Sequence, residues 1–175
     1  MSFHIIIDGY NLIRQSCTLA AFDQKDLQLG REVLLDKLAA YKKIKHHKIT
    51  VVFDAANVLS FLQQRDYIKG IEIKFSRQGE LADAVIKRMA AREAERALVV
   101  TSDRDIVNFV ESHGAATISS SEFEQKITMA EYFALTGAYM DDEEETGWKP
   151  TTKKKGPGKR LSKKDRKSRI KIRKL

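Results

Sequence analysis

"HIIIDGYN", residues 4–11, places an aspartate, a glycine, a tyrosine and an asparagine directly after three consecutive isoleucines. A short apolar run of β-branched residues is typical of a strand that is buried on both faces. The segment FHIII (3–7) therefore predicts a buried strand that ends at Asp8. Gly9 allows the backbone to turn sharply, or to approach a ligand closely, just after this carboxylate.

The same pattern recurs along the chain, and it predicts an α/β fold. Strands that are apolar on both faces and alternate with helical segments indicate a parallel sheet covered by helices on both sides. The segment 70–76 alternates in polarity, so this strand is expected nearer an edge of the sheet. Ser121 and Glu124 have the spacing of a capping box at the start of a helix. Further strands are predicted at 48–55, 70–76, 97–103 and 115–119, and helices at 25–45, 79–97, 104–114 and 121–135.

Charge divides the chain into two unequal parts. Residues 149–175 hold 14 Lys or Arg and one acid, a charge of +13, whereas residues 1–148 hold 18 bases and 23 acids, a charge of −5. This asymmetry suggests a polyanionic partner. We expect a folded domain at 1–138, an acidic-to-basic linker at 139–158 that contains the acidic run DDEEE, and a basic tail at 159–175 that is disordered or becomes helical on binding.

Other global features narrow the class of protein. No apolar run approaches the ~20 residues that a membrane-spanning helix needs, and no signal peptide is visible, so we expect a cytoplasmic protein without a membrane partner. The single cysteine rules out an internal disulfide. The chain has no phosphate-binding G-x-x-x-x-G-K-[ST] motif, and its four histidines lack the spacing of a zinc site.

Aspartates at strand ends form the candidate site. Ligands of an open parallel sheet bind at the carboxyl ends of the strands, and Asp8, Asp54 and Asp103 each follow such an end. Neighbouring strands lie about 4.8 Å apart, so these carboxylates should converge and require a compensating positive charge. Oxygen ligands favour Mg²⁺ or Mn²⁺. Glu80 and Asp83, in the expected first turn of the helix at 79–97, should point to the same place.

Each residue also has a simpler structural interpretation. Asp103 could cap the following helix, Asp83 could pair with Lys87, and Asn11 could cap a short turn instead of binding a phosphate oxygen or a metal-bound water. Asp54 could begin a turn and Glu80 could be a solvated acid. The joint occurrence of these acids favours a shared acidic site, with Asp105 as a supporting carboxylate.

At this point the residues closely resemble the YacP-like group of NYN domains, which belong to the PIN-like nuclease superfamily. The resemblance covers residues 3–135 and lies in IIIDGYNLI, VVFDA, IKFSRQGELADAVIKR, VVTSDRDI and GAATISSSEF. It implies a three-layer α/β/α sandwich with a mainly parallel central sheet, and metal-dependent endonucleolytic cleavage of RNA. The segment VVFDAAN departs from the family pattern, because Ala and Asn follow the aspartate where glycine and small polar residues are expected.

The resemblance also implies roles for individual residues. Asp8 matches the metal ligand after the first strand, Asn11 the asparagine of the signature, Asp83 the helix carboxylate and Asp103 the ligand after the fourth strand. Asp54 matches an acid on the second strand of the family's domain, to which a role is less uniformly assigned. The expected catalytic residues are Asp8, Asn11, Asp83 and Asp103, and the expected ligands of Mg²⁺ or Mn²⁺ are Asp8, Asp54, Glu80, Asp83, Asp103 and Asp105.

Cations are needed to bring RNA to an acidic site, and the tail supplies most of them. It could neutralise many phosphates, while its lack of aromatic residues argues against base stacking. The expected RNA-binding residues are Arg14, Arg77, Lys87, Arg104, Lys153, Lys154, Lys155, Lys159, Arg160, Lys163, Lys164, Arg166, Lys167 and Arg169. We expect mRNA or rRNA as the substrate, with the ribosome as a partner. The alternatives are a non-catalytic RNA- or ribosome-binding module, a DNA nuclease and a small phosphatase.

Overall fold

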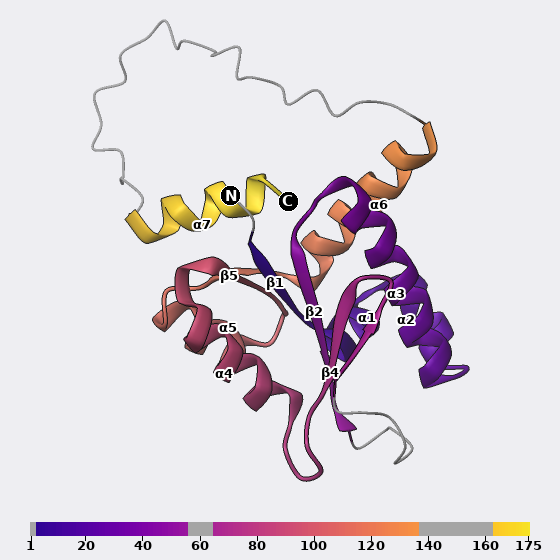
Figure 1. The fold of residues 1–175 in the computed structure, drawn as a ribbon, viewed down its shortest axis with the longest axis horizontal. Coiled ribbons are helices and arrows are strands. Elements are labelled where there is room, and N and C mark those ends of the chain that lie inside the picture. The colour runs from indigo at the N-terminus through magenta and orange to yellow at the C-terminus, as the bar shows by residue number, and fades with distance from the viewer. Residues whose placement is uncertain (1–2, 56–64, 137–162) are drawn as a thin grey trace, which may run out of the picture.

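The computed structural model describes residues 3–55, 65–136 and 163–175, which form a central sheet with helices on both faces (Figure 1). The whole predicted linker at 139–158, with the acidic run at 141–145, therefore lies outside the described residues. In chain order, the elements are β1 (His4–Asp8), α1 (Gly9–Gln15), α2 (Cys17–Asp23), α3 (Leu27–Ile44), β2 (Lys48–Phe53), β3 (Arg65–Ile68), β4 (Ile71–Phe75), α4 (Ala82–Glu93), the 3₁₀ turn η2 (Ala94–Arg96), β5 (Ala97–Val100), α5 (Arg104–Ser112), β6 (Ala116–Ile118), α6 (Ser120–Thr136) and α7 (Lys163–Arg173).

The strand order in the sheet is β3-β4-β2-β1-β5-β6. Every neighbouring pair is parallel except β3 and β4, which form an antiparallel hairpin at one edge. The chain builds outward from β1 to β2 and β4, and then crosses to the other side of β1 to add β5 and β6. The strand order therefore reverses between β1 and β5, and ligands of open parallel sheets bind at such a switch point.

Two apolar cores hold the helices against the sheet. Ile5 and Ile7 of β1 face α1, α2, α3 and α6, whereas Ile6 faces α4 and α5. This alternation follows from the period of two along a strand, and it explains why three consecutive isoleucines are needed. The result is the three-layer α/β/α sandwich with a mainly parallel sheet that the sequence predicted.

Several elements differ from the sequence-based predictions. Helices α1 and α2 and strand β3 were not predicted, and α4 begins at Ala82 rather than at residue 79. The proposed capping box at Ser121 and Glu124 is wrong, because α6 begins at Ser120 and Ser119 Oγ accepts the N–H of Glu122 at 3.3 Å. Glu124 instead accepts a hydrogen bond from Ser16, which links α6 to the start of α2.

The end of the basic tail packs on the folded domain. Helix α7 lies beside the start of β1 (Figure 1). Leu175, just after α7, is buried in the core next to Tyr41, whose hydroxyl donates to the Leu175 carbonyl oxygen at 3.1 Å. The sequence predicts a segment that becomes helical only against a partner; in the structure it is helical and it contacts its own domain.

Candidate active site

Three strand-end aspartates lie at the carboxyl edge of the sheet, on the adjacent strands β2, β1 and β5. Asp8 is the last residue of β1, Asp54 directly follows β2, and Asp103 follows β5 after two residues. Because these strands are parallel neighbours, their ends meet at the same edge, on both sides of the switch point. The predicted convergence of these carboxylates is therefore consistent with the sheet topology.

Each of these carboxylates also binds the first turn of a helix. Asp8 Oδ1 accepts the N–H of Asn11 at 3.2 Å, and Asp103 Oδ1 accepts the N–H of Asp105 at 2.7 Å. Both residues are therefore N-caps, of α1 and α5 respectively. The cap uses one carboxylate oxygen in each case, which leaves the second oxygen of the same side chain for other contacts.

Asp54 has a similar role for a helix that is distant in sequence. Residue Leu81 occupies the N-cap position of α4 and has no side chain that can cap. Asp54 Oδ1 takes this place and accepts the N–H of Ala82 at 2.6 Å. This bond ties the first turn of α4 to the end of β2, and it brings Asp83, the next residue of α4, to the same edge of the sheet.

The electrostatics of the acids show that they are close to one another. Burial raises the pKa of Asp8 to about 6, against the hydrogen bonds from Asn11 and Thr101 that lower it, and the charges of Asp83 and Asp54 raise it further. Burial also raises the pKa of Asp83, and the charge of Asp103 adds to this effect. Four aspartates therefore repel one another at one site, which favours binding of a cation.

Thr101 is a site residue that the sequence analysis missed. Its side chain is buried, and its hydroxyl donates to Asp8 Oδ2 at 3.2 Å while it accepts the N–H of Asp103 at 3.2 Å. It therefore fixes the relative position of two of the acids. The signal was present in VVTSD, where a threonine stands two residues before the aspartate, but its role depends on the pairing of β1 with β5.

Asn11 connects three segments around the site. Its Oδ1 accepts the backbone N–H of Ser102 at 3.0 Å and the hydroxyl of Ser120 at 2.7 Å. Two donors on this atom identify it as the amide oxygen, so the NH₂ group is the part left to contact a ligand. An NH₂ group can donate to a phosphate oxygen or to a water, but it cannot ligate a metal.

Glu80 and Asp105 do not extend the acidic cluster in the predicted way. Glu80 precedes α4, so it does not share a helix face with Asp83; its carboxylate accepts from Arg88 Nη1 at 2.7 Å. The carboxylate of Asp105 pairs with Lys87, which the sequence analysis had considered as an alternative partner for Asp83. Both acids are thus engaged by cations, and their predicted role as metal ligands remains a prediction.

The predicted RNA-binding cations lie at several places. Arg77 and Lys87 line an open hollow together with Asp83 and Asp105. Arg14 packs over the Tyr10 ring, 5.5 Å from its centroid. Arg104 begins α5 next to the Asp103 cap and is exposed, and Arg166 and Arg169 are exposed on α7. The remaining tail cations are those for which the structure describes no side chain: Lys153, Lys154, Lys155, Lys159, Arg160, Lys163, Lys164 and Lys167.

Comparison with known proteins identifies this arrangement. Residues 5–174 match the sequence profile of the YacP-like NYN domain. The chain belongs to the YacP-like NYN family. Its domain is thus a PIN-like nuclease domain, and the match reaches through α7, so the family resemblance extends beyond the region quoted from the sequence.

The chain is similar to the YacP protein of Bacillus subtilis, both in sequence and in structure. The uncharacterized protein YacP is 27% identical over 130 residues, which are 73% of this chain and 76% of YacP. The crystal structure of Rae1 (YacP) matches with a TM-score of 0.60 at 27% identity, over 75% of this chain and 76% of that one. A crystal structure of a mutant of the same Rae1 protein gives a TM-score of 0.62 at 26% identity, over 74% and 77%.

The donor set of this NYN domain fits a hard divalent cation. Carboxylate oxygens are the ligands that Mg²⁺ and Mn²⁺ prefer, and Asp83 forms no ion pair with any described residue. However, the described residues contain no group of three or more His, Cys, Asp or Glu side chains that is arranged to hold a metal ion. The aspartates thus provide suitable oxygen ligands and repel one another, but they are not already arranged around a metal position.

A membrane-spanning segment is not found in the part of the chain that the structure describes. None of its helices combines the length and the apolar character that crossing a bilayer requires.

Proposed function

We propose that this protein is a metal-dependent endoribonuclease that hydrolyses RNA phosphodiester bonds at the Asp8 edge of the sheet. The observation that carries this proposal is the gathering of Asp8, Asp54, Asp83 and Asp103 at the switch point of a PIN-like nuclease domain. The raised pKa values of Asp8 and Asp83 include a mutual repulsion that a bound Mg²⁺ or Mn²⁺ would relieve. Neutral capping residues would have stabilised the same helices without this electrostatic cost.

These four aspartates would hold the cation, and the surrounding residues would keep them in position. Such a cation supplies a more acidic water and stabilises negative charge on the scissile phosphate. Thr101 and the helix first turns fix the carboxylates, so that little reorganisation is needed when RNA binds. The NH₂ group of Asn11 is a suitable donor to a phosphate oxygen. The expected products carry a 5′-phosphate and a 3′-hydroxyl group.

The proposed substrate is mRNA or rRNA, either free or presented on a ribosome. The support for this part is the charge of +13 in residues 149–175, which greatly exceeds the charge that solubility requires. A tail of this kind would make RNA binding depend steeply on salt and only weakly on sequence.

The test is cleavage of labelled RNA, both free and ribosome-bound, with Mg²⁺ or Mn²⁺ and with EDTA. We expect cleavage that EDTA abolishes and that Asp8→Asn or Asp103→Asn reduces roughly 100-fold or more. Asparagine is as good an N-cap as aspartate, so these variants remove the charge and keep the helix cap. Asp26→Asn is the matched control, because Asp26 is an exposed N-cap of α3, outside the candidate site.

Two outcomes would contradict the proposal. Cleavage that persists in both site variants would place the chemistry elsewhere. Retained RNA binding without cleavage of either substrate would instead support a non-catalytic RNA- or ribosome-binding module.

A further inference from the structure

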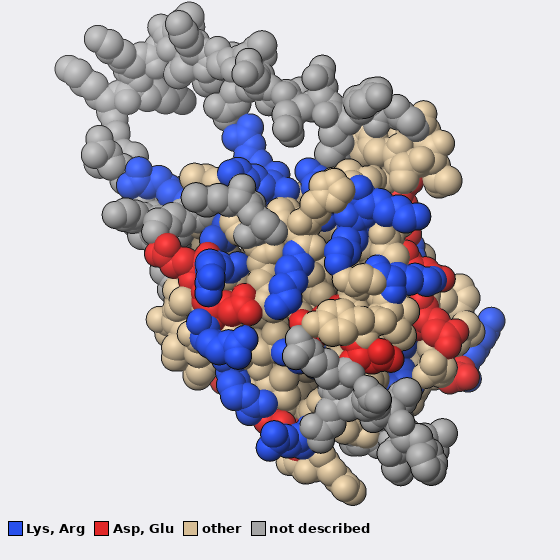
Figure 2. All heavy atoms as spheres, in the orientation of Figure 1, with Lys and Arg blue, Asp and Glu red and all other residues tan. Residues whose placement is uncertain are grey.

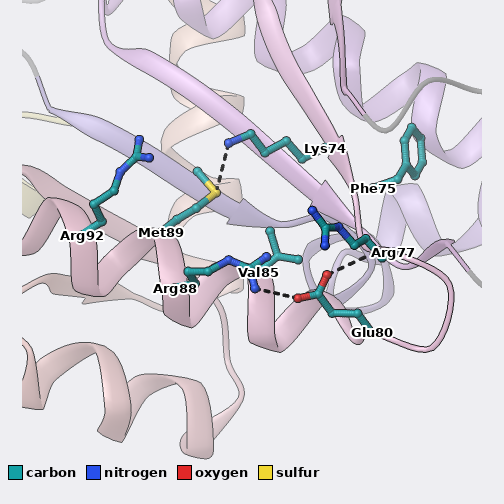
Figure 3. Close-up of a pocket in the computed structure, with 8 residues that line it drawn as sticks. All are labelled: Lys74, Phe75, Arg77, Glu80, Val85, Arg88, Met89 and Arg92. Carbon is teal, nitrogen blue, oxygen red and sulfur yellow. Dashed lines mark hydrogen bonds and ion pairs between the residues drawn. The ribbon is translucent and has the colours of Figure 1, made fainter.

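A groove of about 390 Å³ runs between β4 and α4, next to the acidic site. Figure 3 shows Lys74 and Arg77 on the strand side and Arg88 and Arg92 on the helix side, with Val85 and Met89 between them. Four cations and a single acid, Glu80, thus line one groove. We call this set of residues the β4–α4 groove: Lys74, Phe75, Arg77, Glu80, Val85, Arg88, Met89 and Arg92.

Two of the arginines form no ion pair within the described part of the chain. Glu80 pairs with Arg88 at 2.7 Å, and Lys74 lies 3.4 Å from Glu72. In contrast, the guanidinium groups of Arg77 and Arg92 form no ion pair with any residue that the structure describes, and both side chains are exposed. Figure 2 shows Lys and Arg side chains gathered on the side of the molecule where α4 lies.

The groove leads toward the candidate active site. Arg77 and Glu80 line both the β4–α4 groove and the open hollow that contains Asp83 and Asp105. The groove therefore adjoins the hollow in which Asp83 lies, and a strand that extends beyond the groove on this side would reach Asp83 first. Along α4, Arg88 and Arg92 lie one turn apart, about 6 Å along the helix axis, which is close to the distance between successive phosphates of an extended strand.

From this geometry we infer that the β4–α4 groove binds the sugar–phosphate backbone of the RNA strand that enters the active site. This inference rests on the proposed action on RNA, and it adds Lys74, Arg88 and Arg92 to the expected contacts. Guanidinium groups bind phosphate oxygens in a bidentate manner. Its lining residues include no Asn, Gln, Ser or His, so apart from the four cations and Glu80 it offers no side chain that would hydrogen-bond to base edges.

The test is binding of a mixed-sequence single-stranded RNA to the full chain in EDTA, measured by fluorescence anisotropy at several salt concentrations. We expect Arg77→Gln and Arg92→Gln each to weaken binding for all sequences. Each should also reduce the slope of log K against log salt by about 0.7, the value for one phosphate contact on a single strand. Glu80→Gln should have the opposite effect and tighten binding, because it removes the groove's acid and releases Arg88.

Lys25→Gln serves as the control, since Lys25 is an exposed cation between α2 and α3 on the other face of the sheet. It should leave the affinity and the salt slope within error of the wild type, and thermal melts should show that all variants fold. Equal affinities and slopes for Arg77→Gln, Arg92→Gln and wild type would overturn the inference. If polyglutamate binding depended on these arginines and RNA binding did not, the groove would belong to an acidic protein partner.

The binding test separates this inference from the proposed function. If the groove variants lose RNA affinity and the wild-type chain does not cleave RNA, the proposed nuclease activity is contradicted and the inferred role of the groove is supported. If the wild type cleaves RNA and the groove variants bind RNA as well as the wild type does, the inferred role of the groove is contradicted and the proposed nuclease activity is supported.

Discussion

Asp8 combines a structural role and a proposed chemical role in one side chain. Its Oδ1 accepts the N–H of Asn11 and its Oδ2 accepts the hydroxyl of Thr101, yet only about a tenth of the residue's surface is exposed (9%). Two hydrogen bonds lower the pKa of this carboxyl, but burial outweighs them. An ionised Asp8 is therefore destabilising in the absence of a cation, which is unusual for a helix cap and typical of functional sites.

The first prediction concerns this destabilisation in metal-free protein. The pKa of Asp8 is raised from 3.8 to about 6, so ionisation costs the folded state roughly 3 kcal/mol at pH 7. The folded state binds the proton more tightly than the unfolded state. The penalty is hence absent well below the unfolded pKa of 3.8, grows as the pH rises to about 6, and is complete above it. Asp8→Asn should remove the penalty and raise the free energy of unfolding at pH 7.

Urea unfolding in EDTA between about pH 4 and pH 8 measures this difference. The stabilisation of Asp8→Asn over wild type should be smallest at the acidic end and largest above a pH of about 6, and it should shrink when Mg²⁺ is added. Asp26→Asn serves as the matched control, because it neutralises an N-cap aspartate that is exposed and so relieves no buried charge. A variant that is less stable than wild type at every pH would indicate that Asp8 has only an architectural role.

At the level of elements, the sequence predicted the helices and strands with a strong hydrophobic pattern. It missed those that are stabilised by contacts with other parts of the chain. The predicted strands at 3–7 and 48–55 correspond to β1 and β2 because their apolar runs are unambiguous. Helix α1 begins with glycine and has only seven residues, so its propensity is weak. It is held by the Asp8 cap and by burial of Leu12 and Ile13, which a local pattern cannot show.

Strand β3 was missed for a different reason. Its residues Asp66, Tyr67 and Ile68 are exposed, so they show no buried pattern. The hairpin to β4 turns through Lys69 and Gly70, both with positive φ (52° and 77°). Such a two-residue turn usually carries Asn-Gly or Asp-Gly, and a lysine in the first position hides the signal.

The candidate site was predictable where it depends on sheet topology, and less so where it depends on helix boundaries. Residues that end neighbouring parallel strands must lie at the same edge of the sheet, and the structure places Asp8, Asp54 and Asp103 at one edge. Glu80 was assigned to the first turn of α4, but the helix begins two residues later, at Ala82. The reason is that Asp54, distant in sequence, supplies the cap, and a contact of this range cannot be read from a helical window.

The second prediction tests this long-range cap. Asp54→Ala removes the acceptor of the Ala82 N–H, and it should lower the free energy of unfolding by about 1 kcal/mol. Asp54→Asn keeps an acceptor in the same position and should change stability much less. Hydrogen exchange at the Ala82 amide should become faster in the alanine variant and stay protected in the asparagine variant. Equal protection in both variants would show that Asp54 does not cap α4.

At the scale of the whole molecule, the fold separates an acidic edge from a basic end. The aspartates lie at the carboxyl edge of the sheet, whereas α7 lies beside the start of β1 (Figure 1). Helix α7 is attached through its apolar side: Ile172 packs on the core, Leu175 is buried, and Lys171 donates to the carbonyl oxygen of Glu95. This attachment leaves the side chains of Arg166 and Arg169 exposed.

The last prediction asks whether this attachment contributes to stability in solution. Ile172 packs against the core, while Ile170 on the same helix is 56% exposed. Ile172→Ala should therefore lower the free energy of unfolding by about 1–2 kcal/mol, and Ile170→Ala should change it by less than about 0.5 kcal/mol. Both substitutions leave the charge of the tail unchanged, so urea unfolding reports on packing alone. Equal and negligible effects would mean that α7 does not stay on the domain in solution, and that its basic side chains act from a free tail.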